Sequence, residues 1–270
     1  MAIRGSIRFI GNIYAGSKQK VPLEKTQLKF QLVKVLIVAS ALAMLLPLAS
    51  FAKDRSEILR YEITWNGSKA GHGDVTMKSE DGKVSVLAQA VSDGAVKAIL
   101  EIWSQIRATF STRNFHPESY QFHLKSNLLR SEVVDLSFDH KKQTVLVNKN
   151  NGGELESHSE KSSGLRDPIS AVYLLRNQKD FDKPMFVDIY DGKDKARLHV
   201  SPEGTEMVRV KAGSQQALRM NLRLERLGRE PKEIAKGKLW ISNDENRIPL
   251  LLTSTPIVGN IRFELVQAQM

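Results

Sequence analysis

Residues 59–67 read LRYEITWNG, and their pattern recurs along most of the chain. The odd-numbered positions from 59 to 65 are apolar, and the even-numbered positions between them are polar. This period of two is typical of a β-strand with one face against a core and the other in water. Asn66 and Gly67 come next, and both residue types accept the positive φ angles of a tight hairpin turn. The stretch therefore predicts a half-buried strand that turns straight back on itself.

The same alternation returns in seven further segments, at 106–110, 120–124, 134–138, 185–189, 196–200, 218–224 and 261–265. Turn-forming residues stand between such segments, at 81–82, 150–153, 191–192 and 203–204. One-sided alternation with short turns indicates an antiparallel sheet, because parallel strands buried on both faces read as continuous apolar runs. So many strands with one apolar face must curl to bury it. We therefore predict a mainly β fold, a curled antiparallel sheet that forms a half-barrel, a barrel or a sandwich, with two short helices packed on it.

Two segments interrupt the alternation and predict those helices. The apolar residues of 95–106 fall at helical spacing, at Val96, Ile99, Leu100, Trp103 and Ile106. In the second segment Asp167 precedes Pro168, the usual order of an N-cap and a first helical residue, and Asn177 is a plausible end. Residues 154–164 are polar and small, and we predict a mobile loop there.

The N-terminal region predicts export. An apolar run at 35–46 follows a basic stretch and falls well short of the roughly 20 residues that a membrane-spanning helix needs. Pro47 then interrupts the run, and small residues lead to a predicted cleavage site after Ala52. We assign 1–52 as a signal peptide and 53–270 as a single β-rich exported domain in the periplasm. The basic stretch is unusually long, so translation could start further in, and an uncleaved anchor is the alternative to cleavage.

Charge and cysteine content exclude several classes of function. Residues 1–52 carry seven Lys/Arg and one acid, which leaves 33 bases and 29 acids in 53–270, a net charge of +4 compared with +10 for the whole chain. Most of the basic excess therefore belongs to the export segment, and we expect no nucleic-acid partner. The chain has no cysteine. This excludes disulfides, a thiolate nucleophile, a cysteine metal site and a lipid anchor on cysteine.

The sequence contains no motif that predicts catalysis or a bound cofactor. Its six histidines lack metal-ligand spacing, and no phosphate-binding glycine loop or G-x-S-x-G sequence occurs. Asp135 and Asp139 share the polar face of a predicted strand, which favours a solvated outer surface over a paired-carboxylate site. Trp65, Trp103 and Trp240 could line a pocket, although a core position is favoured for each. We predict no catalytic, cofactor-binding or metal-ligating residues.

Three segments together resemble an exported bacterial family catalogued as domain of unknown function 3108. They are YEITWNGSKAGHGDVTM at 61–77 with its Ala70-Gly71 turn, DPISAVYLLR at 167–176, and LWISNDENRIPLLLTSTPIVGNIRFEL at 239–265. The resemblance covers about residues 57–268. It implies an exported, β-rich protein with no established activity and no catalytic residues to transfer.

Three functions remain open. The first is a non-catalytic cell-envelope protein that binds or carries an apolar or lipidic ligand in the curled sheet, by fold-level analogy with periplasmic lipoprotein carriers. The residues predicted to line its pocket are Tyr61, Ile63, Trp103, Phe122, Leu136, Leu222 and Phe263. The second is an assembly or interaction factor that contacts an envelope protein partner through a sheet edge or a surface patch. The third is a hydrolase with a dispersed site. In all three, membrane contact is expected only through the N-terminal export segment.

Overall fold

The structure is a computed structural model that describes residues 55–178, 181–255 and 259–270. The export segment and the predicted cleavage after Ala52 lie outside the described residues. Within the described ranges, neither helix has the length and apolar character needed to cross a bilayer.

One antiparallel sheet contains all fourteen described strands. In the first half of the chain these are β1 (Arg55–Trp65), β2 (Ser68–Glu80), β3 (Lys83–Ser92), β4 (Ile102–Ser111), β5 (Pro117–Ser126), β6 (Glu132–Asp139), β7 (Thr144–Asn151) and β8 (Glu154–Lys161). The second half forms β9 (Met185–Tyr190), β10 (Lys195–Val210), β11 (Gly213–Arg226), β12 (Lys232–Ser242), β13 (Pro249–Ser254) and β14 (Ile261–Gln269). Two helices are described, α2 (Gly94–Ile99) and α3 (Pro168–Arg176).

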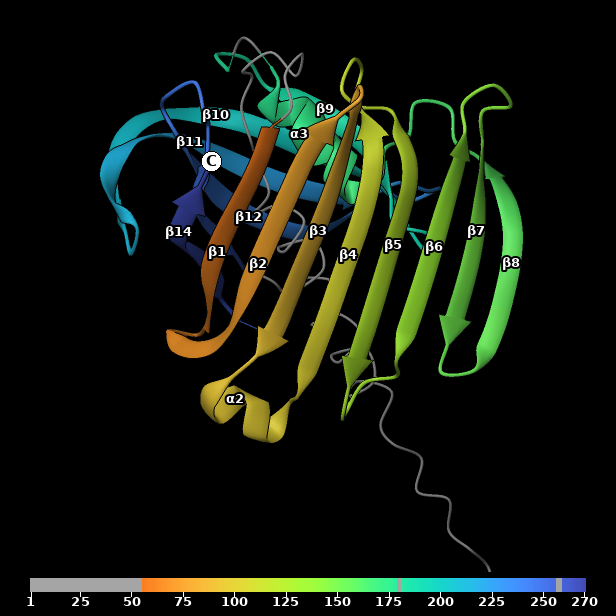
Figure 1. The fold of residues 1–270 in the computed structure, drawn as a ribbon, viewed down its shortest axis with the longest axis horizontal. Coiled ribbons are helices and arrows are strands. Elements are labelled where there is room, and N and C mark those ends of the chain that lie inside the picture. Colours follow the sequence, from red (N-terminus) through yellow and green to blue (C-terminus); the bar gives the residue numbers. More distant parts are fainter. Residues whose placement is uncertain (1–54, 179–180, 256–258) are drawn as a thin grey trace, which may run out of the picture.

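The sheet consists of two meanders joined at one seam. Strands β1 to β8 pair in sequence order, as do β9 to β14, and β1 pairs with β14 to join the two runs. The near half of the sheet, β1 to β8, stands upright, and β10 to β12 cross behind it (Figure 1). The predicted curled antiparallel sheet is confirmed. Of the three shapes left open, the sheet is not closed, because β8 and β9 remain its edges.

The predicted turn chemistry is confirmed at the hairpins. Asn66 and Gly67 have φ angles of 49° and 81°, and Asp81 and Gly82 have 50° and 75°. The turn predicted at 203–204 is wrong, because those residues lie inside β10, where the register shifts between Pro202 and Gly204. The glycine there serves a β-bulge, since β11 pairs with β10 on both sides of it.

Side chains bring the two edges of the sheet together. The Tyr190 hydroxyl donates to Glu160 of β8 at 3.2 Å, and Lys195 Nζ lies 2.6 Å from the same carboxylate. Gly192, in the β9–β10 turn, packs so closely on β6 that an added Cβ would lie 2.5 Å from Val134. The edges therefore meet through side-chain contacts without a backbone ladder between β8 and β9.

Helix α3 fills the interior between the two halves of the sheet, near the upper end in Figure 1. All its residues except Leu174 are buried. It begins as predicted, because Asp167 Oδ1 accepts hydrogen bonds from the main-chain N–H groups of Ile169 at 2.8 Å and Ser170 at 3.0 Å. The Tyr173 ring lies 5.0 Å from the Phe110 ring of β4. Burial of this helix completes the core under the curl of the sheet.

The cap of α3 gives a first testable prediction. Asp167 is fully buried, so Asp167→Ala removes the cap and leaves two buried N–H groups without an acceptor. We expect the free energy of unfolding to fall by about 2 kcal/mol, the upper end of measured N-cap effects. Urea denaturation measures this loss. Asp167→Asn is the control and should cost much less, because an amide oxygen can accept the same bonds; equal losses in the two variants would contradict a capping role.

Two local predictions are wrong. The first helix was expected over 95–106, but α2 ends at Ile99, and Trp103 and Ile106 belong to β4. Val96 and Leu100 face the apolar side of the sheet as expected, but no residue of α2 is buried and Ile99 is exposed. The loop predicted at 154–164 is instead β8 up to Lys161, paired with β7 along its whole length. In both places main-chain pairing with a neighbouring strand determined the conformation, and that pairing does not require the side-chain pattern of a half-buried strand.

An apolar pocket beside helix α2

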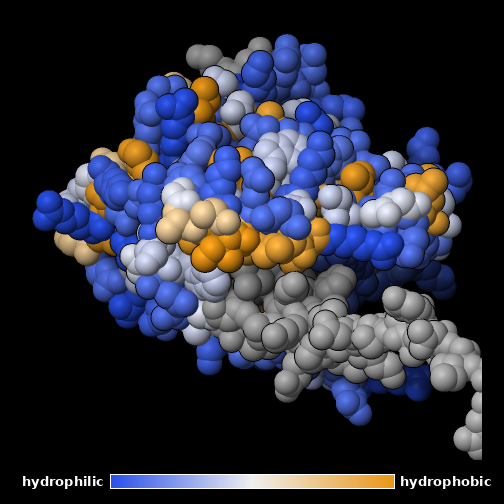
Figure 2. Space-filling view, turned by 90° about the horizontal axis from the view of Figure 1, so that it is seen from below, coloured by the Kyte–Doolittle hydropathy of each residue, from blue (hydrophilic) through white to orange (hydrophobic). Residues whose placement is uncertain are grey.

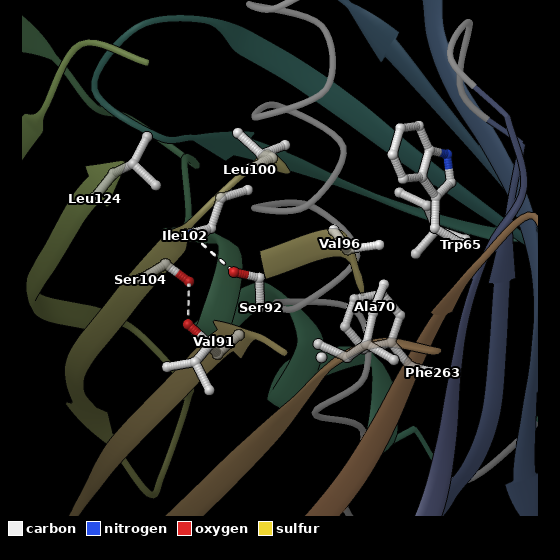
Figure 3. A pocket seen from close by; sticks show the side chains of 14 residues that line it. Trp65, Ala70, Val91, Ser92, Val96, Leu100, Ile102, Ser104, Leu124 and Phe263 are labelled. Atoms are coloured by element: carbon white, nitrogen blue, oxygen red, sulfur yellow. Dashed lines mark hydrogen bonds between the residues drawn. The ribbon is translucent and has the colours of Figure 1, made fainter. Parts of the chain in front are cut away.

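The inner face of the sheet has an apolar pocket at the end where α2 lies, the lower end in Figure 1. Its walls come from β1 to β5, β14 and α2. The cavity is about 50 Å³, within a wider hollow of about 710 Å³ that includes space open to solvent. Trp65, Val96, Leu100 and Phe263 converge on this space from different elements (Figure 3). This is the setting in which an apolar ligand could be enclosed by side chains from both ends of the described chain.

The polar side chains in the pocket wall are engaged by the backbone. Ser92 Oγ accepts a hydrogen bond from the main-chain N–H of Ile102 at 2.9 Å. Ser104 Oγ donates to the main-chain carbonyl of Ala90 at 3.4 Å. Figure 3 shows both bonds as dashed lines between neighbouring strands. The lining residues include no charged side chain. The pocket therefore offers a ligand apolar contact and little polar recognition.

A β-bulge shapes one side of the pocket. Ile63 of β1 pairs with Gly71 and the next residue, Thr64, pairs with Lys69, so Ala70 is the extra residue of β2. Gly71 lies against β3, where an added Cβ would be 2.1 Å from the main-chain oxygen of Val91. Only glycine allows the two backbones to approach this closely. The Ala70-Gly71 pair, predicted as a turn, thus lies within β2 and sets the local width of the sheet.

The structure separates the residues predicted to share one pocket. Ile63 and Phe263 line it. Tyr61, Phe122 and Leu136 are buried in the core instead. Leu222 lines a smaller apolar cavity between α3 and strands β10 to β12.

Trp103 lies on the outer face of β4. It pairs with Lys125 of β5, whose Nζ lies 5.4 Å from the Trp103 ring. Trp65, favoured as a core residue by sequence, is a partly buried wall of the pocket. The alternation around Ile106, carried three residues back, places Trp103 on the outward face. The helical spacing of the apolar residues outweighed this signal in the sequence analysis.

A cluster of buried polar groups lies further along the inner face of β1, toward its other end. Glu57 of β1 and Arg176 of α3 are both buried, and Tyr61 donates its hydroxyl to the carbonyl of Pro249 at 3.1 Å. Burial raises the pKa of Glu57 to about 7, and the positive charge of Arg176 opposes this shift. Burial also lowers the pKa of Arg176 to about 9. The positive charge of Arg176 on α3 thus acts electrostatically on Glu57 of β1, and neither residue lines the pocket beside α2.

The part of the chain that the structure describes holds no group of three His, Asp or Glu side chains placed to bind a metal ion.

Comparison with known proteins identifies the family. A family described as "Protein of unknown function (DUF3108)" matches residues 60–266. The chain belongs to DUF3108. This confirms the resemblance carried by the strand at 61–77, the helix at 167–176 and the tail at 239–265. No match is found among curated proteins.

Solved structures show the fold of this DUF3108 chain. A β-barrel-like protein of domain of unknown function DUF1849 from Brucella abortus superposes with a TM-score of 0.54 at 12% identity, covering 79% of this chain and 97% of that one. A putative exported protein with a YmcC-like fold from Bacteroides fragilis gives a TM-score of 0.36 at 10% identity, covering 79% of this chain and 95% of that one. The first likeness supports a β-barrel-like fold and nothing about activity.

Proposed function

We propose that this DUF3108 protein is a non-catalytic periplasmic protein that binds or carries an apolar or lipidic ligand in the pocket beside α2. The observation that carries the proposal is the pocket wall itself. It combines large apolar side chains with two serines whose hydroxyls already bond the main chain. Most of the wall offers no partner to a ligand's hydrogen-bonding group, so burying such a group there has a cost that an acyl chain does not incur.

The pocket must widen to hold a ligand of this class. Sites for small ligands enclose about 300–1,000 Å³, whereas the cavity here is about 50 Å³. It therefore holds only part of an acyl chain as it stands. We therefore expect α2 to shift outward when a ligand enters, since none of its residues is buried and little packing opposes the movement.

A pocket-filling variant tests the proposal. Ala90→Phe places a ring in the wall of the pocket, and we expect it to weaken binding of a fluorescent fatty acid by about tenfold or more, because ring and ligand compete for one volume. The same change at Ala268, an exposed residue of β14, is the matched control. Fluorescence titration of delipidated protein gives both affinities, and circular dichroism checks that both variants fold.

The proposal is contradicted if native, delipidated protein does not bind the probe. It is also contradicted if Ala90→Phe and Ala268→Phe bind it equally well, because the probe would then occupy another place. Native mass spectrometry of protein purified from the envelope provides a second readout, in which a co-purifying lipid should be present in the wild type and depleted in Ala90→Phe.

One observation favours the second function, an assembly or interaction factor. Among the described strands, β8 pairs only with β7, so the main-chain groups of its other edge have no strand partner, although Tyr190 and Lys195 contact Glu160 there. Charged residues along β8, which include Glu154, Glu156 and Lys161, discourage such pairing. We therefore rank edge pairing below ligand binding. A protein partner in place of a lipid in the native mass spectrum would reverse that order.

A further inference from the structure

Helix α2 presents apolar residues to solvent beside the pocket. Its sequence is GAVKAI, and Ile99 is 73% exposed. Ala95 and Ala98 are also exposed, whereas Val96 on the other side of the helix lines the pocket. An exposed apolar helix side at the pocket entrance needs a reason, because soluble proteins seldom display such surface without a partner.

A second apolar residue extends this surface. Leu128, in the loop between β5 and β6, is 50% exposed. Two hydrogen bonds link its loop to the end of α2: Glu101 N–H donates to Asn127 Oδ1 at 2.9 Å, and Asn127 N–H donates to the carbonyl of Glu101 at 3.3 Å. Figure 2, which views this end of the molecule, shows hydrophobic residues gathered near its centre. We call Ala95, Ala98, Ile99 and Leu128 the apolar rim.

An aromatic residue and a cation lie behind the rim, on the outer face of the sheet. Trp103 is the second residue of β4, and Lys125 is the next-to-last residue of β5, directly opposite it. Lys125 forms no ion pair with an acidic residue in the described ranges; its Nζ lies over the Trp103 ring. Tryptophan and lysine are both found where proteins meet lipid headgroups, because each combines an apolar part with a polar or charged end. Here Trp103 and Lys125 lie next to the more apolar rim.

We propose that the apolar rim docks on an anionic phospholipid surface, with Ile99 and Leu128 entering the outer part of the bilayer and Trp103 and Lys125 at headgroup level. The charge of Lys125 complements anionic headgroups. A second copy of the chain fits less well, because a stable dimer buries about 800 Å² on each partner, more than two large side chains and two alanines offer. The proposal differs from the expectation that only the export segment contacts the membrane.

Docking in this orientation would place the pocket entrance at the lipid surface. Val96 and Leu100 line the pocket, and Ile99 between them belongs to the rim. An apolar ligand could then pass between bilayer and pocket with little exposure to water. The docking surface lies outside the pocket, so it can be tested whether or not the pocket binds a lipid.

The absence of cysteine allows a clean test on the protein purified from the envelope. Ile99→Cys and, as a matched control, Met207→Cys are labelled with an environment-sensitive dye; Met207 is 68% exposed on β10. Vesicles of phosphatidylglycerol and phosphatidylethanolamine should shift the emission of the label at 99 to shorter wavelength and leave the label at 207 unchanged. Any export segment that remains is common to all the proteins compared, so the comparison of Ile99→Asp with Met207→Asp below separates its contribution from that of the rim.

Sedimentation with the same vesicles measures the docking itself. Ile99→Asp should lower the partition coefficient of the protein between vesicles and buffer by about tenfold, because a charge replaces the apolar side chain that enters the bilayer. Met207→Asp should not change this coefficient. Lys125→Glu should weaken binding to anionic vesicles and have little effect on neutral phosphatidylcholine vesicles.

The proposal is overturned if the label at 99 does not respond to vesicles, if the two aspartate variants bind equally, or if the label at 99 shifts through self-association without lipid. The pocket proposal is judged separately, by probe binding in solution.

Discussion

Replacing Arg176 with methionine is expected to lower the free energy of unfolding by about 3 kcal/mol, the upper end of the cost of leaving a buried polar group uncompensated, because the positive charge that favours the ionised form of buried Glu57 is lost. Arg176 is 0% exposed and Glu57 is 1% exposed. Without the guanidinium charge, Glu57 must remain buried as an anion or bind a proton. Urea denaturation of the variant and the wild type measures the loss.

Urea denaturation at several pH values shows whether the charge of Glu57 causes the loss of stability in Arg176→Met. Burial raises the pKa of Glu57 to about 7 from 4.5, so the folded state binds more protons than the unfolded state between those values. The stabilising contribution of the neutral carboxyl is therefore complete below about pH 4.5 and is lost as the pH rises through 7. Stability of the wild type should fall over this interval, and that of Arg176→Met should continue to fall above pH 7, because the pKa of Glu57 rises further once the opposing positive charge is gone.

Two further variants make this prediction specific. The double variant Arg176→Met/Glu57→Gln should recover much of the loss, because it leaves no buried charge at this pair. It should also show a flatter pH dependence, although not a flat one, since burial raises the pKa of Asp167 to about 6 in the same direction. Arg223→Met is the surface control, because its pair with Glu225 at 2.8 Å is exposed to water and contributes about 0–1 kcal/mol. If the double variant is as unstable as Arg176→Met, the loss of stability comes from packing of the Arg176 side chain and the charge of Glu57 is not its cause.

Gly71→Ala is expected to destabilise the protein by about 3 kcal/mol, the upper end of the typical range for overpacking. The new Cβ would lie 2.1 Å from the carbonyl oxygen of Val91 and 3.1 Å from Ser92 Cα. Both are main-chain positions, so β2 and β3 must move apart, and no side chain can relieve the contact by rotating. Because Gly71 also lines the pocket, fatty-acid binding should weaken along with stability.

Gly73→Ala is the matched control for this change. Gly73 lies two residues further along β2, and its added Cβ would be 3.3 Å from the carbonyl oxygen of Gln89, a contact that a small shift relieves. Thermal or urea denaturation should show a loss well under half of that in Gly71→Ala. Similar losses at the two positions would mean that β2 tolerates the contact at Gly71 and that the glycine is not required there.

The sequence by itself determined eight of the fourteen described strands, the exposed and buried faces of those eight, and the antiparallel sheet. Alternation is a local property, so the strand at 59–65 can be predicted from those residues alone. The same holds for the turn at Asn66-Gly67 and for the start of α3 at Asp167, where a side chain bonds the main chain two and three residues later.

The tertiary structure decided what depends on contacts distant in the sequence. Pairing of β1 with β14 brings Ile63 to Phe263 and so forms the pocket, and 200 positions separate those two residues. Pairing with β5 drew Trp103 into a strand in spite of its helical spacing, and pairing with β7 ordered the polar segment 154–161. In these cases main-chain hydrogen bonds to a neighbouring strand outweighed the local side-chain pattern, because any residue except proline can form them. The position of the pocket and of the apolar rim follows from that pairing.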